Sequence, residues 1–148
     1  MKTSIFAILS AIAVSVAHAG DYLTDLEAGK KKAAAEQKAL LVKFTGSDWC
    51  PPCIKLNNEV FKDATFKEGI EKNFVVVVLD YPRKTPLPAA QTATNKKLAK
   101  KYNIKSYPTV MLMDAEGKAF RSIPGYSGIG AKAYLAGVQT ALKAKNFQ

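Results

Sequence analysis

Residues 44–53 of the chain have the sequence FTGSDWCPPC, which contains both of its cysteines, Cys50 and Cys53. The pair stands where a loop gives way to a helix that we expect to begin at Cys50. A cysteine at a helix N-terminus lies near the positive end of the helix dipole and near unpaired backbone N–H groups, and both favour its thiolate. A second cysteine one turn later can reach it and close a small ring. The spacing therefore predicts a redox-active pair.

The two cysteines have different expected roles in thiol–disulfide exchange. We expect Cys50 to attack a substrate disulfide because it lies at the exposed end of the helix. We expect Cys53 to face the core and to resolve the mixed disulfide. Both catalytic roles need only the cysteine pair, so the sequence predicts no metal and no cofactor beyond the Cys50–Cys53 disulfide.

Three other interpretations of the cysteine pair remain open. A structural disulfide would close a loop so short that it removes little chain entropy. A zinc site needs about four ligands, so two cysteines would suffice only if a metal were shared across a dimer. Two unpaired buried thiols are the third alternative. Each explains the pair less well than redox exchange does.

The rest of the chain alternates between helical and strand patterns. The first expected helix is capped by Asp21 or Thr24 and has apolar positions that include Leu23, Leu26 and Ala33. Residues 81–88 contain three prolines and should form an irregular, stiff loop. We expect strands at residues 40–45, 74–80, 109–114 and 118–122, and helices at about 24–39, from 50, and at 64–73, 91–102 and 131–145.

This order of elements predicts an α/β fold. Strands separated by helices are expected to give parallel pairs, and the hairpin formed by the last two strands adds an antiparallel edge. The run FVVVVLD at residues 74–80 is apolar throughout, as is typical of a strand buried on both faces. A central mixed sheet with helices on both faces follows.

Two segments resemble the thioredoxin superfamily. Residues 44–53, followed by a helix, resemble its active-site region, and residues 102–110 (YNIKSYPTV) resemble its cis-proline segment. Gly117 and Gly125 fit the family's hairpin turn and its approach to the last helix. The resemblance extends over almost all of residues 20–148 and is strongest to exported thioredoxin-like proteins. It implies a thioredoxin fold.

The resemblance also implies a substrate-binding role for three residues. Pro108 should be cis and lie beside the cysteine pair, with an ordinary trans proline as the alternative. Tyr107 should line the substrate groove, where its backbone can pair with an extended peptide. Trp49 should shield the pair and offer an apolar platform, unless it is a core-packing tryptophan.

Lys43 departs from the family pattern. Thioredoxins commonly carry a buried acidic residue at this strand position, and one residue is inserted here before Trp49. Lys43 could act by charge on Cys53 or by proton transfer. The alternative is a snorkelling side chain with no catalytic part.

The N-terminus is typical of a signal peptide covering residues 1–19. Lys2 precedes an apolar run at residues 5–16, and residues 17–19 (AHA) fit a cleavage site. A retained membrane anchor is the alternative, but the run is shorter than the roughly 20 residues that a spanning helix needs. We therefore expect a thioredoxin-like domain at residues 20–148, in the periplasm or secreted, with no stable membrane insertion. The only histidine, His18, would be lost with the leader.

The net charge of +10 does not indicate a nucleic-acid partner. Arg83 and Arg121 are the only arginines, and the lysines are scattered along the sequence. A solvated basic surface is the better interpretation, and it can favour acidic partner proteins or an anionic membrane surface.

Together these observations predict an extracytoplasmic thiol–disulfide oxidoreductase that acts on protein disulfides and exchanges electrons with a redox partner protein. Pro51 and Pro52 supply no N–H donor to a thiolate, which favours a reductase or isomerase over a strong oxidase. The alternative is a peptide-binding or chaperone module in which redox activity is incidental.

Overall fold

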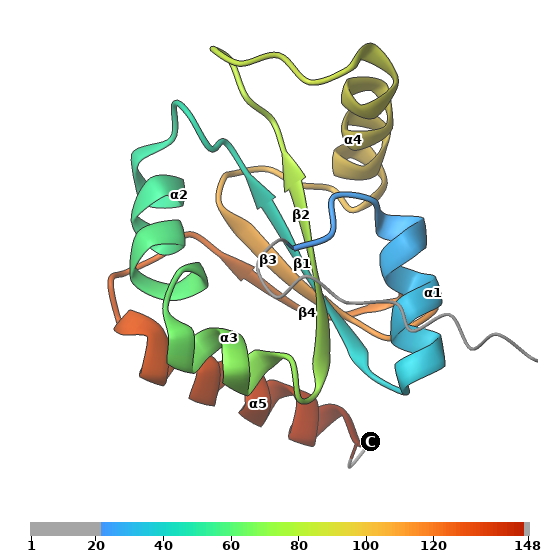
Figure 1. Cartoon of the computed structure of the whole chain (residues 1–148), viewed down its shortest axis with the longest axis vertical. Coiled ribbons are helices and arrows are strands. Elements are labelled where there is room, and N and C mark those ends of the chain that lie inside the picture. Colours follow the sequence, from blue (N-terminus) through green and yellow to red (C-terminus); the bar gives the residue numbers. More distant parts are fainter. Residues whose placement is uncertain (1–21, 147–148) are drawn as a thin grey trace, which may run out of the picture.

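A computed structural model describes residues 22–146 of the chain (Figure 1). A four-stranded sheet in the order β2-β1-β3-β4 forms the centre. Its strands are β1 (Ala39–Thr45), β2 (Phe74–Asp80), β3 (Thr109–Met113) and β4 (Ala119–Pro124). The helices are α1 (Leu26–Glu36), α2 (Pro51–Leu56), the π-helical turn η1 (Asn57–Phe61), α3 (Ala64–Ile70), α4 (Ala89–Lys101) and α5 (Gly130–Asn146).

Strand β1 alternates its side chains between two cores, one on each face of the sheet. Leu41 packs with side chains of α2, η1, α3 and α5, including Leu56 and Phe66. Leu40 and Phe44 pack on the opposite face, which α1 and α4 cover. The predicted mixed sheet with helices on both faces is confirmed.

The direction of β3 differs from the expectation. Strands β1 and β2 are parallel, as predicted for strands joined through helices. Strand β3 also follows a helix, but it pairs antiparallel to β1, with Thr109 opposite Phe44. Residues 102–108 return the chain to the carboxyl end of β1, so β3 starts where β1 finishes. The expectation of a parallel pair was therefore wrong for β3, and the β3–β4 hairpin is antiparallel as predicted.

The first helix begins and ends at other residues than expected. Its N-cap is Asp25, whose carboxylate accepts a hydrogen bond from the Ala28 N–H, and not Asp21 or Thr24. The helix stops at Glu36, because Gln37 adopts a left-handed conformation with φ of 54°. Leu23 lies outside the helix and bridges Val77 of β2.

The predicted signal peptide at residues 1–19 lies outside the described residues. Within residues 22–146, each helix is too short or too polar to cross a membrane.

Candidate functional site

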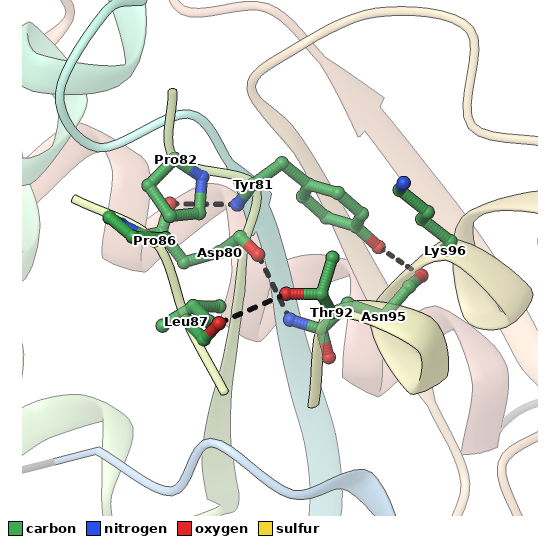
Figure 2. Close-up of a pocket in the computed structure, with 8 residues that line it drawn as sticks. All are labelled: Asp80, Tyr81, Pro82, Pro86, Leu87, Thr92, Asn95 and Lys96. Carbon is green, nitrogen blue, oxygen red and sulfur yellow. Dashed lines mark hydrogen bonds between the residues drawn. The ribbon is translucent and has the colours of Figure 1, made fainter. Parts of the chain in front are cut away.

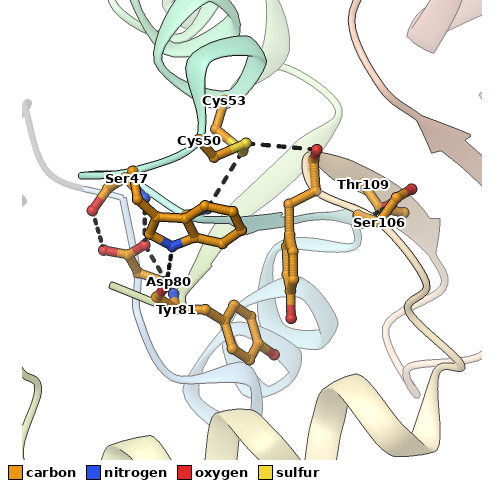
Figure 3. Close-up of a disulfide and its surroundings, with 10 residues drawn as sticks. Ser47, Cys50, Cys53, Asp80, Tyr81, Ser106 and Thr109 are labelled. Carbon is orange, nitrogen blue, oxygen red and sulfur yellow. Dashed lines mark hydrogen bonds between the residues drawn. A yellow bond between two sulfur atoms is a disulfide. The ribbon is translucent and has the colours of Figure 1, made fainter. Parts of the chain in front are cut away.

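Cys50 and Cys53 form a disulfide at the start of α2 (Figure 3). Cys50 is the N-cap residue, and Pro51 and Pro52 occupy the first two helical positions, because neither position needs an N–H there. The Cys50 carbonyl accepts the first helical hydrogen bond from Ile54 at 3.0 Å. The helix therefore begins where the sequence predicted.

Both cysteines are buried in this oxidised form. Cys50 is 3% exposed and Cys53 is 1% exposed. The expected exposure of Cys50 was therefore wrong for the disulfide state. The reason is that Cys50 lies against the segment before β3, where its Sγ is 3.6 Å from the carbonyl oxygen of Tyr107. Cys53 faces the core as predicted, and its Sγ accepts a hydrogen bond of 3.4 Å from the Gly46 N–H.

The segment next to Cys50 is held in place from both sides. The Tyr107–Pro108 peptide bond is cis, as the resemblance implied. The Pro108 carbonyl accepts a hydrogen bond of 2.7 Å from Gly125, and the Thr109 hydroxyl donates one of 2.8 Å to the Ser106 carbonyl. Tyr107 and the cysteine pair are thus brought together, as predicted.

Trp49 lies beside the disulfide, outside both cores. Its indole N–H donates a hydrogen bond of 2.7 Å to the Tyr81 carbonyl, and its ring meets Tyr107 edge-on at 6.0 Å between centroids. A Cβ at position 46 would overlap the indole, so Gly46 permits this packing. Trp49 is half-buried, but its platform is not free, because the Arg83 guanidinium lies 3.6 Å from the ring centroid.

The proline-rich loop at residues 81–88 is tied to the active-site loop by Asp48. The Asp48 carboxylate accepts hydrogen bonds from the backbone N–H groups of Arg83, Lys84 and Thr85 at 2.9, 2.7 and 2.9 Å. These bonds, led by the one from Arg83, lower the pKa of Asp48. A second link joins the active-site loop to the end of β2, since the Ser47 N–H donates to the Asp80 carboxylate at 2.9 Å.

Helix α4 supports the same loop through Asn95 (Figure 2). The Asn95 side chain is buried and donates a hydrogen bond of 2.9 Å to the Asp80 carbonyl, while the Tyr81 hydroxyl donates to the Asn95 carbonyl at 2.7 Å. A cavity of about 190 Å³ remains under the loop, lined also by Pro86 and Leu87. The loop is therefore part of the site's framework.

Lys43 is buried beside the cysteine pair. The residue is 3% exposed, its Nζ donates a hydrogen bond of 2.9 Å to the Asn57 side chain, and it lies 4.0 Å from the centroid of the Phe61 ring. Burial lowers the pKa of Lys43 to about 8, although the negative charge of Asp80 acts in the opposite direction. The side chain is therefore nearly fully buried, with its amine bonded to Asn57.

A cavity of about 230 Å³ brings Lys43 and Cys53 into one space. Asn57, Asp80 and the exposed Lys62 are among its other lining residues. A lysine with a pKa near 8 in such a place can exchange a proton near neutral pH. Across residues 22–146, no three His, Cys, Asp or Glu side chains gather closely enough to hold a metal ion.

Sequence reasoning missed the residues that hold the site together. Asp48, Asp80 and Tyr81 act through contacts between distant segments, for which the sequence offers no pattern. Asn57 follows Cys53 by one helical turn, so its place on the same helix face as Cys53 could have been inferred from the spacing. Arg83 stood out only as one of two arginines.

Comparison with known proteins places this geometry in a family. A model of the thioredoxin-like domain matches residues 26–136. The chain is 33% identical over 108 residues to the disulfide bond reductase DsbH of Chlamydia pneumoniae, covering 73% of this chain and 64% of that protein. It is 28% identical over 102 residues to the thioredoxin-related protein DsbJ of the same organism, covering 69% of this chain but only 29% of DsbJ.

A solved structure agrees with these sequence matches. The structure of a DsbH oxidoreductase superposes with a TM-score of 0.75 at 28% identity, and the match covers 96% of this chain and 95% of that one. The two chains share the overall fold, which in this chain is a mixed sheet with helices on both of its faces. The chain therefore belongs to the thioredoxin-like domain family.

Proposed function

We propose that the chain is an extracytoplasmic thiol–disulfide oxidoreductase that reduces or isomerises protein disulfides. The observation that carries this proposal is the Cys50–Cys53 disulfide at the start of α2, with the Cys50 Sγ 3.6 Å from the Tyr107 carbonyl. Opening the disulfide gives a helix-capping thiolate, which the helix dipole favours.

The reaction balances with the two cysteines alone. The Cys50 thiolate attacks one sulfur of a substrate disulfide, and the other substrate sulfur leaves as a thiolate. The Cys53 thiolate then attacks the Cys50 Sγ and releases the second substrate thiolate. The substrate gains two electrons, and the protein ends as the disulfide found in this structure.

Substrate binding is assigned to the surface formed by Trp49, Tyr107 and Pro108. An extended peptide beside Tyr107 would bring its own cysteine to Cys50, as in edge-strand recognition. The edge-on contact between the Trp49 and Tyr107 rings gives this surface a fixed shape.

The proposal also covers the direction of the disulfide exchange and the location of the protein. Pro51 and Pro52 have no N–H groups, so few hydrogen-bond donors lie near the Cys50 thiolate. A thiolate that is not strongly stabilised favours a reductase or isomerase over a strong oxidase. The similarity to a protein named disulfide bond reductase supports the same direction. A partner protein would keep the pair reduced, and residues 1–19 would direct export and be removed, leaving the domain at residues 20–148.

Lys43 is proposed to assist Cys53. Its amine lines the same cavity as Cys53, and its lowered pKa suits it to take the Cys53 proton or to favour the thiolate by charge. The hydrogen bond to Asn57 would hold it in position.

Insulin reduction with dithiothreitol as the electron donor tests the proposed function. The protein lacking residues 1–19 should accelerate insulin precipitation, and Cys50→Ser should abolish the acceleration. Peptide binding that persists in a variant lacking both cysteines, with no turnover by the wild type, would instead support a peptide-binding module.

A further inference from the structure

Among residues 22–146, one arginine without an acidic side-chain partner lies over the tryptophan that directly precedes the reactive disulfide. Arg83 is exposed, and its guanidinium lies over the Trp49 ring at 3.6 Å from the centroid. Among the salt bridges of residues 22–146, none involves Arg83. Its donors are therefore available to a ligand.

The loop holds this arginine in a defined place. The Asp48 carboxylate binds the backbone N–H groups of residues 83–85, so it fixes the loop without forming an ion pair with the guanidinium. Pro82 and Pro86 restrict the backbone on either side. Stacking on Trp49 orients the guanidinium further. An oriented arginine loses less freedom on binding than a free one would.

The position is close to where a substrate must lie. Trp49 directly precedes Cys50 in the sequence, and the Trp49 ring contacts Tyr107, whose carbonyl lies beside the Cys50 Sγ. The guanidinium is thus one aromatic ring away from the surface on which the substrate cysteine would bind. Residues a few positions from that cysteine in an extended peptide can reach it.

We propose that Arg83, stacked on Trp49, forms a carboxylate-binding subsite that selects substrates with Asp or Glu near the reactive cysteine. This inference rests on the proposed oxidoreductase function and deepens it. A guanidinium presents a planar fork of donors that matches a carboxylate in a bidentate arrangement. The neighbouring Lys84, also exposed, adds positive charge to the same loop.

Three peptides test the subsite. Each carries one cysteine as a mixed disulfide with thionitrobenzoate, and they differ only in flanking residues, which are Glu, Gln or Lys. The reduced Cys53→Ser protein should attack them and release coloured thionitrobenzoate, whose appearance gives a second-order rate. We expect the Glu peptide to react about three- to fivefold faster than the Lys peptide, as suits an exposed charge pair. Added salt should reduce this ratio.

Variants at the two arginines make the test specific. Arg83→Gln should bring the Glu-to-Lys ratio close to one, and Arg83→Lys should restore part of it. Arg121→Gln, on β4 away from the disulfide, removes the same charge and should keep the wild-type ratio. A ratio of one in the wild type, or a ratio unchanged in Arg83→Gln, would overturn the inference. Release from none of the peptides would overturn the proposed function itself, and the inference with it.

Discussion

The Nζ of Lys43 donates a hydrogen bond of 2.9 Å to the Asn57 side-chain oxygen, at the edge of a cavity that Cys53 also lines. The two residues come from β1 and η1, so the contact joins the strand before the active site to the turn that directly follows α2, the helix that carries Cys53. Because burial lowers the pKa of this amine to about 8, its protonation state near neutral pH responds to changes in charge around Cys53.

Lys43→Met should slow the release of trapped substrate and leave the initial attack by Cys50 nearly intact. We expect release to slow about tenfold or more, since a positioned acid or base contributes at least that much. Stopped-flow measurement of the two steps between about pH 6 and pH 9 would check this. Lys62→Met is the matched control, because Lys62 lines the same cavity but is exposed. Equal rates for Lys43→Met and the wild type throughout this range would exclude the role.

The buried amine should also make stability depend on pH in a predictable direction. The pKa of Lys43 falls from 10.5 to about 8 on folding, so between these values the unfolded state binds more protons. Stability should therefore rise with pH across this window, by up to about 3 kcal/mol. In the oxidised protein, urea unfolding should show this rise relative to Lys43→Met. Parallel pH profiles would contradict it.

Trapping of mixed disulfides can distinguish the attacking cysteine from the resolving cysteine. Cys53→Ser should accumulate mixed disulfides between Cys50 and substrate proteins, because no thiol remains to resolve them. Cys50→Ser should not accumulate them. Non-reducing gels followed by mass spectrometry would identify the bound cysteine. Trapping by Cys50→Ser in place of Cys53→Ser would reverse the assignment.

The reduction potential should lie at about −180 to −270 mV, nearer thioredoxin and the isomerases than the strong oxidant DsbA at about −120 mV. The physical reason is the pair of prolines at the first helical positions, which give the Cys50 thiolate no N–H donors. Equilibration with a glutathione or dithiothreitol series would measure it. A value above about −150 mV would favour an oxidase instead.

Asp48→Ala should loosen the proline-rich loop. Three backbone N–H groups lose their acceptor, so the amides of Arg83, Lys84 and Thr85 should exchange with solvent about tenfold faster or more. Hydrogen exchange followed by NMR would show this. Asp114→Ala is a suitable comparison, because Asp114 caps one backbone N–H, that of Lys118, in the β3–β4 turn. Unchanged exchange at residues 83–85 would contradict the anchoring role.

The features that sequence predicted are those set by neighbouring residues. The placement of Cys50 at the N-cap follows from Pro51 and Pro52, which fit only the first turn of a helix. The two-sided burial of β2 follows from its unbroken run of apolar residues. The cis-proline segment was open to recognition because its residues form a short motif before a strand.

The features that sequence did not predict depend on distant contacts. Asp48 accepts hydrogen bonds from backbone amides 35 to 37 residues away, and no local sequence pattern predicts such contacts. The environment of Lys43 depends on Asn57 and Phe61 of η1, which come into contact with β1 only when the chain folds. The burial of Cys50 depends on the Tyr107 carbonyl, 57 residues later.

The bridge between Leu23 and Val77 has a practical consequence for handling the protein. Leu23 exchanges hydrogen bonds with Val76 and Val78 at 3.2 and 2.7 Å, so it covers part of the outer edge of β2. An uncovered edge with the sequence FVVVVLD would invite strand-to-strand association between molecules. Recombinant versions that begin after Leu23 should therefore aggregate more readily than those that begin at Gly20.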